Sequence, residues 1–117
     1  MIKYNSLHNT DCLRASISSI IKIDLIDFPD LTITSKEWAS ILRNYMESKG
    51  YKLTFYDKLD DNELNNYHLV IYLNPYIENQ YHCVVGKNGV IVHNPTENDN
   101  YDYSELPVDY YGAIVKI

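Results

Sequence analysis

The sequence predicts a single α+β domain in which helices come first and an antiparallel sheet follows. Its 117 residues, 45% of them hydrophobic, fit one folded domain. Apolar residues recur at helical spacing before Gly50 and alternate with polar residues after it. No repeat, low-complexity linker or change in composition divides the chain, so residues 1–117 are expected to form one domain.

The first helix is expected over residues 11–22, DCLRASISSIIK. Leucine and isoleucine recur there at helical spacing, and the small residues between them allow close packing. The side-chain oxygen of Thr10 or Asp11 can accept the open amide hydrogens of the first turn. Cys12 is therefore expected in the first turn of this helix.

The second helix is expected to begin at Thr34 or Ser35 and to stop at Gly50. Thr34 and Glu37 have the spacing of a capping box, and glycine is a common C-terminal stop. Pro29 ends helical continuation from the first helix. The apolar stripe of the second helix consists of Trp38, Ile41, Leu42 and Tyr45.

Five strands are expected after Gly50, with a two-residue hairpin turn at Lys87 and Asn88. The acidic residues 57–63 are interpreted as a solvated connection. The polar, tyrosine-rich residues 94–109 form either a lid over a site or a plain exposed loop. The expected strands are residues 51–56, 68–73, 81–86, 89–93 and 112–117.

Cys12 is the first candidate for a chemical role. At the start of a helix, exposed amide hydrogens and the helix dipole stabilise a thiolate and lower the pKa of a thiol. A thiolate is the nucleophile in acyl transfer. The alternative interpretation is a small buried core residue. Cys83 is interpreted as structural, and no disulfide between the two cysteines is expected.

His82 and Asn94 are expected to meet through the hairpin. His82 lies at the start of one strand and Asn94 follows the next. Pairing Gly86 with Gly89 across the turn places His82 opposite His93, with Asn94 next along. The amide oxygen of Asn94 can then accept the imidazole N–H and aim the other ring nitrogen at a thiolate. Alternatively, His82 is a surface histidine and Asn94 a simple turn residue.

Two segments resemble papain-like cysteine peptidases. NTDCLRASISSII is similar to the D-C-x-x-A opening of these proteins, and HCVVGKNGVIVHNP is similar to their H-x-V-V hairpin ending in N-P or D-P. With IDLIDFPDL between them, the chain looks most like short phage and bacterial papain-like proteins, over about residues 5–117. The resemblance implies a papain-like fold, with N-terminal helices packed on a small antiparallel sheet. It also implies a catalytic triad of Cys12, His82 and Asn94.

The resemblance implies the remaining parts of the site as well. In such folds the amide of the cysteine and a nearby polar side chain bind the oxyanion. Ser6 stands where glutamine is usual, so Asn5 and Asn9 are the expected side-chain amides. Asp11 and His93 are expected to contact the substrate.

The predicted function is a papain-like cysteine hydrolase with peptidase, amidase or acyltransferase chemistry and no cofactor. Because the domain is short for this class, its substrate is expected to be a small or restricted acyl or amide compound, or a peptide. The alternative is a catalytically inactive papain-like binding protein that captures a host protein or a small molecule, such as a signalling nucleotide. The absent glutamine and the tyrosine-rich loop favour this alternative.

Composition argues against other classes of partner. The formal net charge of −6 does not suit a nucleic-acid binder. No segment is long and apolar enough to span a bilayer, and the N-terminus lacks the layout of a signal peptide. The protein is therefore expected in the cytoplasm, or in the host cytoplasm if a phage encodes it. The sequence carries no signal for the oligomeric state.

A zinc site is the competing use of the same side chains. His8, Cys12, His82 and His93 are residues of the kinds that bind zinc. No C-x-x-C or H-E-x-x-H pair is present, and His8 precedes the helix, so helical geometry between His8 and Cys12 is not assured. No bound metal is therefore expected.

Overall fold

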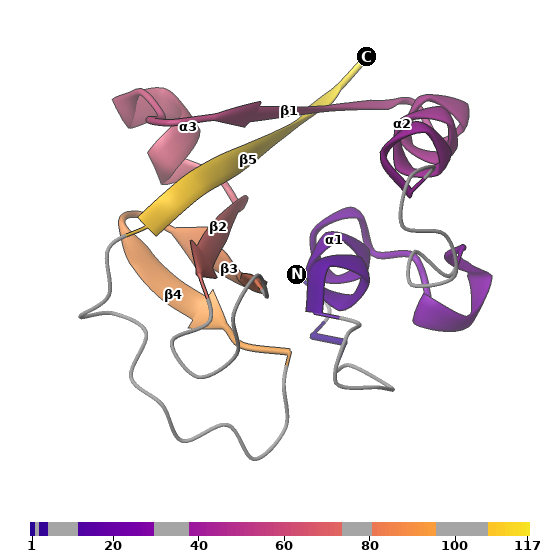
Figure 1. Ribbon diagram of the computed structural model, residues 1–117, viewed down its shortest axis with the longest axis horizontal. Coiled ribbons are helices and arrows are strands. Elements are labelled where there is room, and N and C mark those ends of the chain that lie inside the picture. Colours follow the sequence, from indigo (N-terminus) through magenta and orange to yellow (C-terminus); the bar gives the residue numbers. More distant parts are fainter. Residues whose placement is uncertain (2, 5–11, 30–37, 74–80, 96–107) are drawn as a thin grey trace.

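In the computed structural model, five strands form one antiparallel sheet, and helices α1 and α2 pack against one of its faces (Figure 1). The structure describes residues 1, 3–4, 12–29, 38–73, 81–95 and 108–117. The strand order is β1-β5-β2-β3-β4, so the last strand of the chain lies between the first and the second. The predicted α+β class is confirmed.

Most helices and strands begin and end close to the expected residues. Gly50 has a positive φ of 84° just after α2, as expected of a C-terminal stop. The caps expected from Thr10 or Asp11 and from Thr34 with Glu37 lie outside the described residues. No helix in the described part of the chain has the length and apolar character needed to cross a membrane. The elements are α1 (Cys12–Ile21), the 3-10 helix η1 (Leu25–Asp27), α2 (Trp38–Ser48), β1 (Tyr51–Tyr56), α3 (Asp61–Asn65), β2 (His68–Leu73), β3 (Tyr81–Lys87), β4 (Val90–His93) and β5 (Val108–Lys116).

The stretch expected to be a solvated connection, residues 57–63, instead leads into helix α3. The carboxylate of Asp60 accepts from the amide of Glu63 at 2.8 Å, and the carboxylate of Glu63 accepts from the amide of Asp60 at 3.1 Å. This reciprocal capping box pairs two amides that a helix start would otherwise leave open. The D-x-x-E spacing is visible in the sequence, but no apolar stripe follows it, so periodicity alone does not predict the helix.

The β3–β4 hairpin turns one residue later than expected. Asn88 and Gly89 have φ values of 55° and 79°, so they are the two central residues of the turn. A two-residue turn with positive φ at both positions suits the sequence Asn-Gly. Lys87 consequently pairs with Val90.

The expected pairing of His82 with His93 is wrong. Beyond the turn there is a β-bulge: Gly86 pairs with Ile91, but the next residue of β3, Val85, pairs with His93. Val92 is therefore the extra residue of β4. His93 therefore lies opposite Val85. A bulge depends on packing around the strand, so the sequence of the turn does not predict it.

Strand β5 begins at Val108, before the expected start at Gly112. It pairs with β1 on one side and with β2 on the other. The residues VDYY at its start form strand because they lie in the middle of the sheet, where pairing outweighs local preference.

Two apolar clusters lie on the two faces of the sheet. The larger contains Cys83 of β3 together with buried side chains of α1 and α2. The smaller contains Val84, the next residue of β3, together with Val70 and Tyr72 of β2. Since successive strand residues point to opposite faces, Cys83 faces the helices and Val84 faces away from them.

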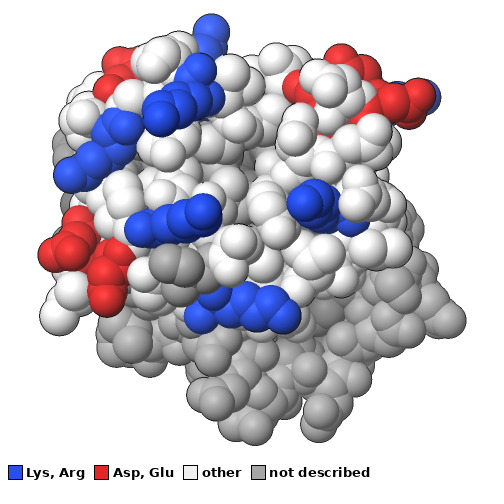
Figure 2. Space-filling view, turned by 180° about the vertical axis from the view of Figure 1, so that it is seen from behind, with Lys and Arg blue, Asp and Glu red and all other residues white. Residues whose placement is uncertain are grey.

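Charge is unevenly distributed over the surface. Although the formal net charge is −6, Figure 2 shows Lys and Arg side chains gathered across the middle of one face, with Asp and Glu toward its margins. One face is therefore locally basic. The exclusion of nucleic acid as a partner depends on the net charge and stays a prediction.

Met46 tests the packing of α2 on the sheet. Its side chain is fully buried in the larger cluster, so Met46→Ala is expected to lower the free energy of unfolding by about 2–5 kcal/mol through the cavity it leaves. Urea titration followed by circular dichroism measures the change. Val90→Ala, at a side chain that is 61% exposed, is the control, and it is expected to cost less than about 0.5 kcal/mol. Equal losses would contradict the described packing.

Candidate functional site

His82 and Asn94 are hydrogen-bonded in the structure. The Nε2–H of His82 donates to Oδ1 of Asn94 over 3.0 Å. Because an amide oxygen only accepts, the proton of the neutral imidazole lies on Nε2, and Nδ1 keeps its lone pair. The bond thus sets both the tautomer and the orientation of the ring.

The β-bulge places Asn94 on the same side of the sheet as His82. Through the bulge, His93 lies opposite Val85 and shares the face that carries α1. Asn94 is the next residue and lies toward the other face, as does His82, one residue before Cys83. The expected contact is therefore present, although the expected register is wrong.

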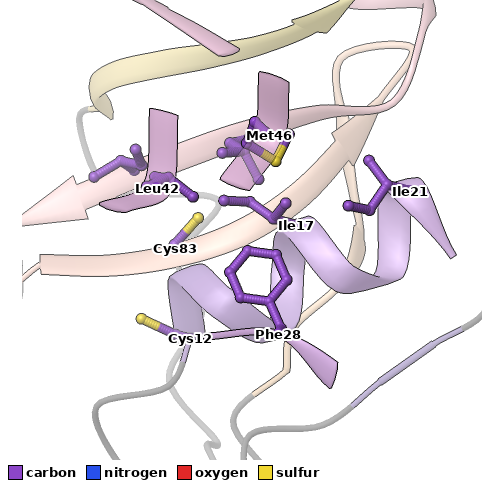
Figure 3. Packing of buried hydrophobic residues seen from close by; sticks show 9 residues of the cluster. Cys12, Ile17, Ile21, Phe28, Leu42, Met46 and Cys83 are labelled. Carbon is purple, nitrogen blue, oxygen red and sulfur yellow. The ribbon is translucent and has the colours of Figure 1, made fainter. Parts of the chain in front are cut away.

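Cys12 is the first residue of α1, and its side chain is 8% exposed. It belongs to the larger apolar cluster together with Cys83 of β3 (Figure 3). One turn further along α1, the hydroxyl of Ser16 donates to the carbonyl of Cys83 over 3.2 Å. Residues four apart share a helix face, so the face that carries Cys12 is the one that lies against β3.

A second set of contacts joins the later part of α1 to the hairpin through Tyr4. The hydroxyl oxygen of Ser19 accepts from the amide of Tyr4 over 3.0 Å. The carbonyl of Tyr4 accepts from Nε2–H of His93 over 2.6 Å. Because His93 lies opposite Val85, this part of α1 lies near Val85 on β3.

These contacts define the position of Cys12 along β3. Ser16 lies level with Cys83. Ser19, which is further along α1, lies near Val85, which is further along β3. Helix α1 and strand β3 therefore run in the same direction. The turn from Ser16 back to Cys12 spans about 6 Å of helix, which corresponds to about two residues of strand. Cys12 is therefore level with the start of β3, where His82 lies.

Cys12 and His82 approach this rim of the sheet from different faces. Cys83 faces α1, whereas strand alternation directs His82 to the side of Val84. His82 is 6% exposed and pairs with Tyr72 of β2. A contact between the thiol and the imidazole would form around the rim where β3 begins.

Cys83 remains a neutral thiol near physiological pH. Burial raises the pKa of this thiol well above its usual range, because the thiolate would lose its hydration. Negative charge on Cys12 raises the pKa further, whereas the hydrogen bond with the Ser16 side chain lowers it. The two thiols are thus neighbours that do not ionise together, which suits the structural role predicted for Cys83.

The other predicted site residues are mostly outside the described residues. His93 is described: it is 8% exposed, and its Nε2 is bound to the carbonyl of Tyr4. A substrate contact through that nitrogen would have to displace Tyr4. The predicted site residues outside the described ranges are Asn5, Asn9 and Asp11. Ser6, which stands where glutamine is usual, and His8 of the zinc alternative also lie outside them.

The described side chains are not arranged as a zinc site. Within the described ranges, no group of three or more His, Cys, Asp or Glu side chains could hold a metal ion. His82 and His93 each use Nε2 in a hydrogen bond, and they lie on opposite faces of the sheet. His8, the remaining histidine of the competing zinc set, is not among the described residues.

Two further residues near the site were not predicted as part of it. Ser16 ties α1 to β3, and Tyr72, which is 4% exposed, lies opposite His82 on β2. The spacing of Ser16 from Cys12 already indicates a shared helix face. Tyr72 has no such signal, because no short turn sets the register of β2 with β3.

No family model, curated protein or solved structure matches the chain. The resemblance to papain-like proteins therefore rests on the motifs alone. The fold itself is a five-stranded antiparallel sheet with helices.

Cys83 is expected to resist alkylation in the folded protein. Its side chain is 3% exposed and its thiol pKa is raised, so the reactive thiolate is scarce. At pH 8, iodoacetamide should modify Cys83 at least about 100-fold more slowly in the folded protein than in the urea-unfolded chain. Peptide mass spectrometry measures both rates, and similar rates would contradict the core position of this thiol.

Proposed function

We propose that the chain is a papain-like cysteine hydrolase in which Cys12 is the nucleophile, His82 the general base and Asn94 the residue that orients the base. The observation that carries the proposal is the hydrogen bond from Nε2 of His82 to Oδ1 of Asn94. It leaves Nδ1 as the nitrogen that accepts a thiol proton. The position of Cys12 supports the proposal, because the thiol lies level with the start of β3.

The start of a helix suits a cysteine nucleophile. The first-turn amides have no partners within the helix, and together with the helix dipole they favour negative charge nearby. This environment stabilises a thiolate and promotes transfer of the thiol proton to His82. The reactive form is then a thiolate on Cys12 beside an imidazolium on His82.

The reaction begins when the thiolate of Cys12 attacks the carbonyl carbon of an acyl or amide substrate. The amide of Cys12 binds the resulting oxyanion together with a side-chain amide, for which Asn5 and Asn9 are the candidates. His82 then gives its proton to the leaving group, and a thioester on Cys12 remains. Water activated by His82 hydrolyses the thioester, whereas another acceptor gives acyl transfer. Asn94 keeps the imidazole in position during both steps.

The burial of Cys12 bears on the substrate. With 8% of its side chain exposed, the cysteine admits few approaches to its sulfur. A small acyl or amide compound, or a single peptide bond on an extended chain, suits such a site better than a long peptide in a deep cleft.

The same burial favours a second function, that of a papain-like binding protein without turnover. Cys12 packs in the larger apolar cluster, where a cysteine can act as a small hydrophobic residue. In this function the chain captures a host protein or a small molecule and forms no thioester.

The reactivity of Cys12 distinguishes the two functions. At pH 6, iodoacetamide is expected to alkylate Cys12 about 10- to 100-fold faster than a model thiol, because a paired thiolate persists where an ordinary thiol is protonated. His82→Ala is expected to reduce the rate to that of the model thiol or below. Peptide mass spectrometry resolves Cys12 from Cys83, which serves as an internal reference.

The matched control is His68→Ala. It removes an imidazole that is 2% exposed, compared with 6% for His82, at the start of β2, where His68 lies opposite Gly86. The Cys12 rate should change by less than about threefold in this variant. A wild-type rate no higher than that of the model thiol, or equal losses in the two histidine variants, would remove the hydrolase and leave the binding protein.

Asn94→Ala and Asn94→Asp test the orienting role. Alanine removes the acceptor for Nε2–H, whereas aspartate keeps an oxygen there. Asn94→Ala is expected to slow Cys12 alkylation at pH 6 about tenfold and to move the midpoint of its pH profile toward that of an ordinary thiol, about 8.5. Asn94→Asp should retain most of the wild-type rate. Identical pH profiles for the alanine variant and the wild type would show that Asn94 does not orient the base.

A further inference from the structure

A hollow of about 540 Å³ lies at the C-terminal end of β1, which is an edge strand of the sheet. Its lining includes Phe55, Tyr56, Asp57 and Tyr110. Phe55 and Tyr56 are 39% and 43% exposed. Exposed aromatic residues that border one hollow are more characteristic of a binding surface than single exposed apolar residues.

Two of the rings, those of Phe55 and Tyr110, meet edge to face. The ring centroids of Phe55 and Tyr110 are 5.5 Å apart, and the ring planes meet at 86°. In an edge-to-face pair, the edge of one ring covers part of the other ring's face. A point in the angle between the rings lies beside one face and obliquely over the other, and the face is the negative part of the aromatic quadrupole. A cation within about 6 Å of such ring centroids is attracted to them. Tyr56 also borders the same hollow.

Asp57 adds a full negative charge. Among the described residues of the lining, it is the one with a charged side chain. The carboxylate and the ring faces both favour a cation, and both disfavour an anion. An uncharged apolar ligand would gain contact with the rings but nothing from the carboxylate.

The chain's own lysines already use tyrosine faces in this way. Nζ of Lys87 lies 4.4 Å from the ring centroid of Tyr67. Nζ of Lys49 lies 5.7 Å from the ring centroid of Tyr45. Ammonium groups therefore approach aromatic rings elsewhere on this surface at distances typical of a cation–π contact.

We propose that the hollow formed by Phe55, Tyr56, Asp57 and Tyr110 binds a cationic group, either an alkylammonium or a guanidinium. The cation lies against the faces of Phe55 and Tyr110, and Asp57 balances its charge. None of the four residues belongs to the catalytic triad, so this site does not depend on the proposed hydrolase function.

NMR titration of the ring protons of Phe55 and Tyr110 tests the site. The cationic probes are tetramethylammonium, N-acetyl-lysine amide and N-acetyl-arginine amide, and N-acetyl-norleucine amide is the uncharged match for lysine. The cations are expected to shift both sets of resonances saturably, with dissociation constants on the order of 1–10 mM. The norleucine probe should bind at least about tenfold more weakly. Preference for tetramethylammonium identifies a free quaternary ammonium as the ligand, whereas preference for lysine or arginine identifies a peptide side chain.

Two variants separate the contributions of ring and charge. Phe55→Leu keeps apolar bulk but removes a ring face, and it is expected to weaken cation binding about 2- to 30-fold. Asp57→Asn is expected to weaken binding and to abolish its dependence on salt between about 50 and 500 mM. Val115→Ala, at a residue of β5 that is 57% exposed and is not part of this lining, is the matched control and should leave the affinity unchanged.

Three results would overturn the proposal: norleucine amide binding as tightly as the cations, shifts that do not saturate, or unchanged affinity in both Phe55→Leu and Asp57→Asn. The first two of these results come from the wild-type protein, so they decide the matter even if a variant fails to fold.

Discussion

The hydrogen bond from the Ser16 hydroxyl to the carbonyl of Cys83 determines how α1 lies on the sheet. Apolar contacts alone are not directional, so they would allow the helix several positions along β3. A buried hydroxyl without its partner would cost about 1–3 kcal/mol, which penalises the other positions. With Ser16 held at Cys83, Cys12 is held one turn away, level with the start of β3. The place of the candidate nucleophile thus depends on a serine that takes no part in the chemistry.

The other half of the site is built by the hairpin. Positive φ at Asn88 and Gly89 closes the turn, and the bulge that follows directs Asn94 to the face of His82. Helix and hairpin are joined to each other by Tyr4, which bonds to one residue of each. Because the helix packs on one face while His82 and Asn94 lie toward the other, the rim at the start of β3 is where the two halves can meet.

The sequence predicts the elements whose burial produces a regular pattern. The helix that carries Cys12 and most strands follow from apolar periodicity, because each has one buried face. Helix α3 has no buried face, and its one signal is the capping box at Asp60. The turn is ambiguous by one residue from strand pattern alone, and the preference of Asn-Gly for positive φ decides it. The early start of β5 and the approach of Tyr72 to His82 depend on pairing between strands that no short turn connects. The bulge depends on packing around β4. No local pattern contains either kind of information.

The bulge at Val92 also determines which changes of length the hairpin can absorb. If Val92 were deleted, regular pairing would still bring His93 opposite Val85, and Asn94 would still follow on the face of His82. If the bulge were straightened at the present length, His93 and Asn94 would exchange faces, and both would lose their partners. The separation of 12 residues between His82 and Asn94 is therefore not a requirement of the contact. Related chains could carry one residue fewer here and keep the same pair, so chain length in this hairpin is less constrained than the direction in which its side chains point.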